Sequence, residues 1–133
     1  MLAAAGFFTA LSATEAVADP NSTRTFSVSG ASGGHSGYSN GYLYFYNRSV
    51  GITGSVKSDT TGCVQVVFQV YSHGEETDFQ TRTACGRGTG SSTGFNFTSP
   101  ADYSGGASEV RVTLAGINSL GQSHWLDARS YYP

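Results

Sequence analysis

The two cysteines of the chain, Cys63 and Cys85, constrain its fold more than any other feature. Apolar residues occupy every even position from 64 to 70, turn-forming residues follow at 73–75, and a more polar segment leads back to Cys85. Period-two alternation beside a turn predicts an antiparallel hairpin. With the turn centred on Gly74, Cys63 and Cys85 face each other. We therefore expect a disulfide at the open end, which stabilises the fold by about 3 kcal/mol.

The register of this hairpin predicts an irregularity. Strict pairing around Gly74 sets Arg82 opposite Val66, which places a charge beside the apolar row of the first strand. It also sets Phe79 opposite Gln69. A one-residue bulge near the turn would move Phe79 onto the apolar row and keep the cysteines close. We expect such a bulge.

The N-terminus indicates export. Residues 2–11 form an apolar run too short to span a bilayer, and Ala16-Val17-Ala18 has the small-x-small pattern of a signal peptidase site. This predicts a signal peptide at 1–18 and a secreted, extracellular protein. No Lys or Arg precedes the apolar run, so either the true start lies upstream of Met1 or this segment is not a signal. A short buried N-terminal helix is the alternative.

Size and charge narrow the class of partner. Removing 18 of the 133 residues leaves 115, which is enough for one domain with a modest core. Seven Lys and Arg against nine Asp and Glu, without a basic run, argue against binding to nucleic acid or to a membrane surface. In an oxidising compartment the cysteine pair is structural and not a redox centre.

Glycine and serine dominate residues 29–41, SGASGGHSGYSNG. Such a composition favours a flexible segment, or one that becomes ordered on a partner. The sequence therefore predicts a flexible leader at 19–41, with one short strand around Phe26 and Val28.

The rest of the chain, residues 42–133, predicts an all-β domain. Besides the cysteine hairpin, short strands are expected at 42–46, 49–57, 95–97, 109–114 and 122–132, separated by Gly-rich turns. A single open sheet would leave one apolar face in water. We therefore expect a small antiparallel β-sandwich of seven or eight strands, similar in size to an immunoglobulin domain, with one disulfide. A small barrel is the alternative.

Catalytic and metal-binding patterns are weak. The G-x-S-x-G pattern occurs at 30–34 and 90–94, but neither copy has the following helix that a nucleophile elbow requires. His35, His73 and His124 lack the spacing of a metal site, and we interpret them as solvent-exposed. The acidic residues at 75, 76 and 78 are typical of a solvated turn. The sequence predicts a protein without catalytic residues, metal or cofactor.

Aromatic side chains form the more promising surface. Tyr42, Tyr44 and Tyr46 alternate along one strand, so they face outward if the residues between them face the core. Tyr38 and Trp125 are expected near them. Tyrosine and tryptophan combine an apolar body with a polar tip, which suits a protein interface or stacking on a sugar. These five residues are the predicted binding site for a partner or a glycan.

The Ala-rich signal, the Gly/Ser leader, the tyrosine-rich strand and the segment CVQVVFQVY…TRTACGRGT resemble small secreted β-sandwich proteins of filamentous actinobacteria. That group is similar to the small adaptor subunit of the umbrella toxin particles, a non-enzymatic protein that links a lectin-like subunit to a long scaffold subunit through an extended N-terminal segment. The resemblance covers the mature chain by its layout. It implies an adaptor in an extracellular toxin complex.

Two functions follow as hypotheses. The first is a secreted, non-enzymatic adaptor that docks on other secreted proteins through its leader and its aromatic strand. The second is a carbohydrate or cell-wall binding module that uses the Tyr and Trp surface.

Overall fold

A computed structural model of the chain describes residues 20–133. They form eight strands: β2 (Ser22–Ser32), β3 (His35–Phe45), β4 (Ser49–Ser58), β5 (Cys63–Ser72), β6 (Glu75–Cys85), β7 (Ser92–Pro100), β8 (Glu109–Ile117) and β9 (Ser123–Tyr131). These residues include no helix long and apolar enough to cross a membrane. The signal peptide expected at 1–18 lies outside the described residues.

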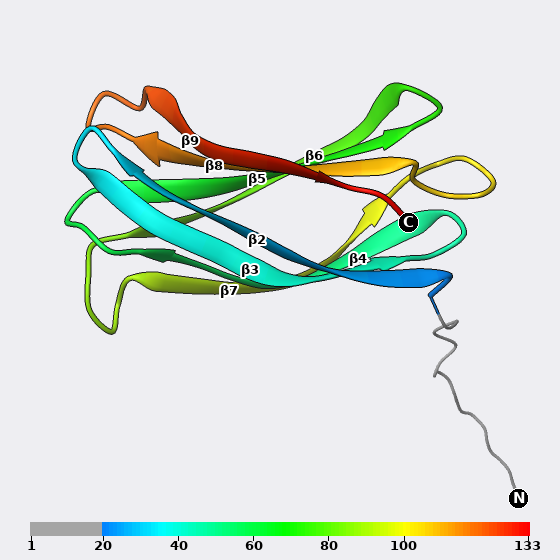
Figure 1. Cartoon of the computed structure of the whole chain (residues 1–133), viewed down its shortest axis with the longest axis horizontal. Coiled ribbons are helices and arrows are strands. Elements are labelled where there is room, and N and C mark those ends of the chain that lie inside the picture. Colours follow the sequence, from blue (N-terminus) through cyan, green and yellow to red (C-terminus); the bar gives the residue numbers. More distant parts are fainter. Residues whose placement is uncertain (1–19) are drawn as a thin grey trace, which may run out of the picture.

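The strands form two antiparallel sheets of four strands each. Their orders are β2-β3-β4-β7 and β6-β5-β8-β9. The two sheets lie face to face as layers (Figure 1). The predicted all-β sandwich is therefore confirmed, and the barrel alternative is wrong, because each sheet ends in two edge strands and does not close on itself.

The core lies between the sheets and follows the period-two pattern of the sequence. On β5, Val64, Val66, Phe68 and Val70 are each at most 1% exposed. Phe68 lies at the centre of an aromatic cluster, with its ring centroid 5.4 Å from those of Phe26 and Phe95 and 5.7 Å from that of Phe97. These three partners come from β2 and β7, so the cluster joins the two sheets.

The cysteine hairpin forms as predicted. β5 and β6 pair with Cys63 opposite Cys85, and the two residues form the disulfide with their Cα atoms 4.0 Å apart. A bulge interrupts the pairing between Val70 and Tyr71, next to the turn. The position of the bulge agrees with the expectation. Its expected effect is wrong, because Phe79 still pairs with Gln69 and is 53% exposed on the outer face.

The charges of β6 remain on its inner face and contact β7. The Asp78 carboxylate accepts a hydrogen bond of 2.6 Å from the Ser99 hydroxyl. The Arg82 guanidinium lies 4.3 Å from the centroid of the Phe97 ring, a cation–π contact. Because the two groups find these partners at the sheet edge, Asp78 and Arg82 stay opposite Val70 and Val66, and the register changes only at the bulge beyond Val70. Inward charges also prevent another strand from pairing with the edge.

The expected flexible leader is wrong for residues 22–41. β2 and β3 pair along their whole length, from Ser22 opposite Phe45 to Ser32 opposite His35. Gly33 and Gly34 make the connecting turn with φ of 59° and 83°, a conformation that glycine adopts without strain. Phe26 and Val28 are 2% and 1% exposed in the core, so burial against the other sheet orders a segment whose composition suggests flexibility.

Two paired glycines let β3 and β4 approach each other beneath a core aromatic ring. Gly41 of β3 pairs with Gly54 of β4. A Cβ atom at Gly41 would overlap the Thr53 carbonyl and would lie 2.9 Å from Cε2 of Phe26. These positions therefore exclude a side chain for packing reasons.

Side chains of β9 cover the free edge of β2. The Ser27 N–H donates to the Tyr131 hydroxyl over 2.9 Å, and the Ser29 N–H donates to the Asp127 carboxylate over 3.1 Å. Figure 1 shows β2 and β9 running along the same side of the sandwich. An edge strand normally offers such N–H groups to another chain. Here they are already satisfied.

Candidate functional site

The outer face of the sheet β2-β3-β4-β7 carries Tyr38, Tyr42, Tyr44 and Tyr46, and we call it the tyrosine face. Leu43 and Phe45 are buried, so the alternating tyrosines of β3 point away from the core. Tyr42 is 48% exposed and Tyr38 is 37% exposed. Tyr44 and Tyr46 are half-buried.

The tyrosine rings support one another on the sheet. The Tyr42 and Tyr44 rings stack, with centroids 6.1 Å apart and planes inclined by 22°. Gly51 of β4 makes room for the next ring, because a Cβ atom there would lie 3.2 Å from Cε2 of Tyr46. The rings therefore lie side by side over the sheet and form a broad surface.

The neighbours of the tyrosines are small and polar. Apart from Lys57, the other outward positions in the same rows carry hydroxyl groups, amides or no side chain: Thr23, Thr25, Ser27, Ser29, Asn40, Gly51, Thr53, Ser55, Ser92, Gly94, Asn96 and Thr98. Lys57 is the one charged side chain at an outward position of these four strands. Its ammonium group donates to the Ser91 hydroxyl over 2.6 Å and lies 3.9 Å from the Asp59 carboxylate.

Surfaces that bind proteins often share this composition. The buried centres of protein interfaces are rich in aromatic residues and poor in charge. Tyrosine with serine, glycine and asparagine also forms the contact surfaces of antibodies, because tyrosine gives a large contact area at low entropic cost. The tyrosine face can therefore supply apolar contact and short hydrogen bonds over four strands.

Trp125 does not belong to the tyrosine face. It lies on β9, pairs with Ala115 of β8 and is 66% exposed on the outer face of the other sheet. Four of the five residues predicted to bind a partner or a glycan therefore lie on one surface, and Trp125 does not. Trp125 lies on the other sheet, and the sequence does not show this because contacts between residues distant in sequence decide which strands share a sheet.

Trp125 lines a groove on that other sheet, which we call the Phe79–Trp125 groove. Its volume is about 290 Å³. Its lining comes from all four strands of the sheet or their ends: Gln65, Val67, Gln69, Phe79, Thr113, Ala115, Ser123 and Trp125. Phe79 on β6 and Trp125 on β9 stand on the two edge strands, and Val67 and Thr113 pair between them. Sequence reasoning missed this groove because it expected Phe79 to be buried.

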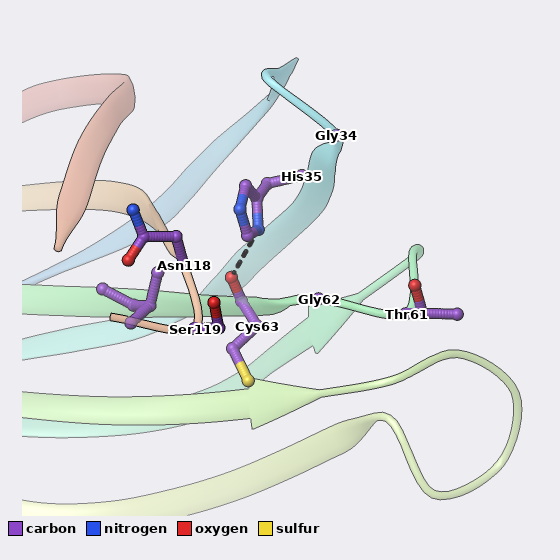
Figure 2. Close-up of a pocket in the computed structure, with 8 residues that line it drawn as sticks. Gly34, His35, Thr61, Gly62, Cys63, Asn118 and Ser119 are labelled. Atoms are coloured by element: carbon purple, nitrogen blue, oxygen red, sulfur yellow. Dashed lines mark hydrogen bonds between the residues drawn. The ribbon is translucent and has the colours of Figure 1, made fainter. Parts of the chain in front are cut away.

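The structure also brings together two histidines that are distant in sequence. The ring centroids of His35 and His124 are 5.0 Å apart. Each ring donates to a backbone carbonyl over 3.0 Å: Nδ1 of His35 to Cys63, and Nε2 of His124 to Ser32. Figure 2 shows the first of these bonds beside a pocket of about 420 Å³. Both of these histidines are half-buried, so the interpretation of them as solvent-exposed is wrong, whereas His73 is exposed as expected.

Gly116 is the one residue in the sequence that could have indicated this histidine pair. It stands at an inward position of β8, in line with Val112 and Leu114, where a larger residue is expected. A Cβ atom there would lie 2.7 Å from Cγ of His35 and 2.8 Å from Cε1 of His124. Within residues 20–133, no three His, Cys, Asp or Glu side chains gather as a metal site would require.

The two G-x-S-x-G segments lie in strands and turns. Ser32 is the last residue of β2, and Ser92 is the first residue of β7. A nucleophile elbow needs a helix directly after its serine, whereas each of these serines is followed by a turn or a strand. His124 approaches Ser32 through its carbonyl oxygen and not through its hydroxyl group.

The acidic residues of the β5–β6 turn bind different partners. Glu75 accepts a hydrogen bond of 2.8 Å from the Tyr103 hydroxyl, and Glu76 accepts one of 3.1 Å from the Gln69 amide. The hydrogen bond to Glu75, together with the negative charge of that carboxylate, raises the pKa of Tyr103 above its usual value of 10.0. The Asp78 carboxylate points inward to Ser99. The carboxylates therefore do not converge on one point.

Comparison with known proteins finds no match. No family model fits the chain, and no curated protein or solved structure is significantly similar to it.

Proposed function

We propose that this chain is a secreted, non-enzymatic interaction protein that docks on a protein partner through its tyrosine face. The observation that carries the proposal is the stacked pair of exposed Tyr42 and half-buried Tyr44 at the centre of a four-stranded surface with one charged side chain. A stable protein interface covers about 800 Å² on each partner. A broad sheet face with few charges suits such a contact.

The disulfide supports an extracellular location. Cys63 and Cys85 are the only cysteines of the chain, and they are bonded to each other. Disulfides of this structural kind persist in oxidising compartments and are rare in the cytosol. Together with the signal pattern at residues 1–18, this is the basis for proposing secretion.

The finer form of the proposal is an adaptor in an extracellular toxin complex, as the layout resemblance implies. Its partners would then be a lectin-like subunit and a scaffold subunit. In the umbrella toxin adaptor the docking element is an extended N-terminal segment. Here residues 22–41 are part of the sandwich, so the docking element must be a different one. The N–H groups of Ser27 and Ser29 are occupied by β9, so β2 does not offer them to a partner's sheet. The proposal therefore assigns the contact to the tyrosine face.

Site-specific photocrosslinking tests the proposal in the producing organism. A photoreactive amino acid is placed at Asn40 or Thr53, among the tyrosines, and for comparison at Gln122, an exposed residue of the β8–β9 connection. We expect one dominant protein adduct from Asn40 and Thr53 and none from Gln122. The adduct should disappear when Tyr42→Ser and Tyr44→Ser are added.

Two results would contradict the proposal. One is an adduct that is equally strong from Gln122 or that survives the two tyrosine substitutions. The other is retention of the purified protein on insoluble polysaccharide that is lost in Tyr44→Ala, which would make the tyrosine face a carbohydrate site.

A further inference from the structure

We infer that the Phe79–Trp125 groove is a binding site for an uncharged, β-linked polysaccharide chain. This inference goes beyond the proposed function and does not rest on it, because the groove and the tyrosine face lie on opposite outer faces of the sandwich. The groove would give the protein a second ligand of a different chemical class.

The aromatic rings that line the groove have no evident role in folding. Phe79 is 53% exposed and Trp125 is 66% exposed, although both could gain about 1.5–3 kcal/mol from full burial. Neither belongs to the core or to the partly buried residues that pack against it. An exposed aromatic ring can stack on the C–H face of a pyranose whose hydroxyl groups are equatorial, as in β-linked glucose or N-acetylglucosamine.

The polar groups of the groove suit hydroxyl groups. Nε2 of Gln65 donates to the Thr83 hydroxyl over 3.1 Å, and Nε2 of Gln69 donates to the Glu76 carboxylate over 3.1 Å. These bonds use one amide hydrogen of each glutamine and fix the side chains on the sheet. Within residues 20–133, no hydrogen bond uses the second amide hydrogen or the carbonyl oxygen of either glutamine. These groups can therefore bind a ligand. A side-chain amide both donates and accepts, as a sugar hydroxyl does.

The charge of the groove favours an uncharged ligand. None of its eight lining residues is ionisable. One carboxylate, that of Glu76, lies beside the groove, where it accepts the hydrogen bond from Gln69. The Arg111 guanidinium on the same outer face is paired, 3.4 Å from the Glu109 carboxylate and 5.4 Å from the Tyr71 ring centroid. An acidic polysaccharide would find no free cation in the groove, whereas a neutral one loses no charge solvation there.

The shape of the groove favours a chain over a small molecule. Phe79 and Trp125 stand on β6 and β9, which are three strand spacings apart, or about 14 Å. Small side chains at Thr113 and Ala115 keep the floor between them low. A ligand that touches both rings must therefore be extended, and an unbranched chain of several sugars fits this requirement.

The groove contains its own reporter, because Trp125 is the only tryptophan of the chain. Tryptophan fluorescence is recorded during titration with chitohexaose, cellohexaose and xylohexaose, and with oligogalacturonate as the acidic comparison. We expect a saturable change with at least one neutral oligosaccharide and none with oligogalacturonate. Phe79→Ala keeps the reporter and should weaken binding by at least about tenfold, which corresponds to about 1.4 kcal/mol.

Controls separate this inference from the proposed function. The double variant Tyr42→Ser and Tyr44→Ser should bind the oligosaccharide as the wild type does, and Phe79→Ala should retain the protein crosslinks from Thr53. Thermal unfolding of Phe79→Ala shows whether the variant is folded.

Several outcomes would overturn the inference. They are no saturable response to any of the three neutral oligosaccharides, an equal affinity in folded Phe79→Ala, or a preference for oligogalacturonate. Loss of oligosaccharide binding in the variant with Tyr42→Ser and Tyr44→Ser would place the glycan on the tyrosine face instead.

Discussion

The Tyr131 hydroxyl near the C-terminus lies 2.9 Å from the backbone nitrogen of Ser27 and 3.3 Å from its carbonyl oxygen. One hydroxyl group thus satisfies both polar groups of an edge residue in the opposite sheet. The contact joins β9 to β2, the last strand to the first described one, and closes one side of the sandwich.

Removing this hydroxyl should destabilise the fold. Tyr131→Phe leaves the Ser27 N–H and carbonyl without this partner, and we expect the free energy of unfolding to fall by about 1 kcal/mol. Tyr132→Phe is the matched control, because Tyr132 is 58% exposed and its backbone carbonyl, not its hydroxyl, accepts the bond from Arg24. Denaturant unfolding measures both variants. Equal stability of the two would refute the role given to Tyr131.

The aromatic cluster should dominate stability. Phe68 is fully buried and contacts rings from both β2 and β7, so Phe68→Ala should lower the free energy of unfolding by about 4 kcal/mol. Phe79→Ala removes the same side chain from the outer face and should cost about 0.5 kcal/mol or less. Chemical denaturation of the pair checks this contrast. A similar loss in both variants would show that Phe79 packs in the core, as the sequence alone suggests.

The close approach of β3 and β4 at Gly41 should tolerate no side chain. Gly41→Ala would push a methyl group against the Thr53 carbonyl and Phe26, so we expect a marked loss of thermal stability. Gly94→Ala on β7 is the control, because the nearest atom to a Cβ there is the Gly54 carbonyl at 3.9 Å. Differential scanning calorimetry should show a lower melting temperature for Gly41→Ala than for Gly94→Ala. The reverse order would contradict the packing described here.

The Tyr103–Glu75 contact should change the titration of one tyrosine. The hydrogen bond to Glu75 and the charge of Glu75 raise the pKa of Tyr103, so Glu75→Gln should lower it toward 10.0. Because the pKa is raised in the folded state, the contribution of this contact to stability is complete below pH 10 and is lost as the pH rises through the folded-state value. Tyrosine-resolved NMR titration measures the shift. An unchanged Tyr103 titration in Glu75→Gln would exclude the contact in solution.

The sequence predicts the fold where local patterning is strong. The alternation from Val64 to Val70 and the placement of Cys63 opposite Cys85 are sufficient for the hairpin, because burial on one face and a disulfide both depend on nearby residues. Residues 29–41 contain little β-forming signal. Their order comes from pairing of β2 with β3 and from the burial of Phe26 and Val28.

The candidate sites depend more on topology. Tyr42 and Tyr44 share a face because they alternate on one strand, which the sequence shows directly. Trp125 faces the opposite side of the molecule, and His124 meets His35, because the order of strands in each sheet decides these positions. Nothing in the local sequence determines that order.

We propose that a protein partner covers the tyrosine face when the protein is outside the cell. Hydroxyl-radical footprinting compares labelling of the chain in the culture supernatant of its producer with labelling of the purified protein. We expect labelling of Tyr42 and Tyr44 to fall several-fold in the supernatant, whereas labelling of exposed Tyr132 is unchanged. Equal labelling of Tyr42 and Tyr44 in both samples would contradict it.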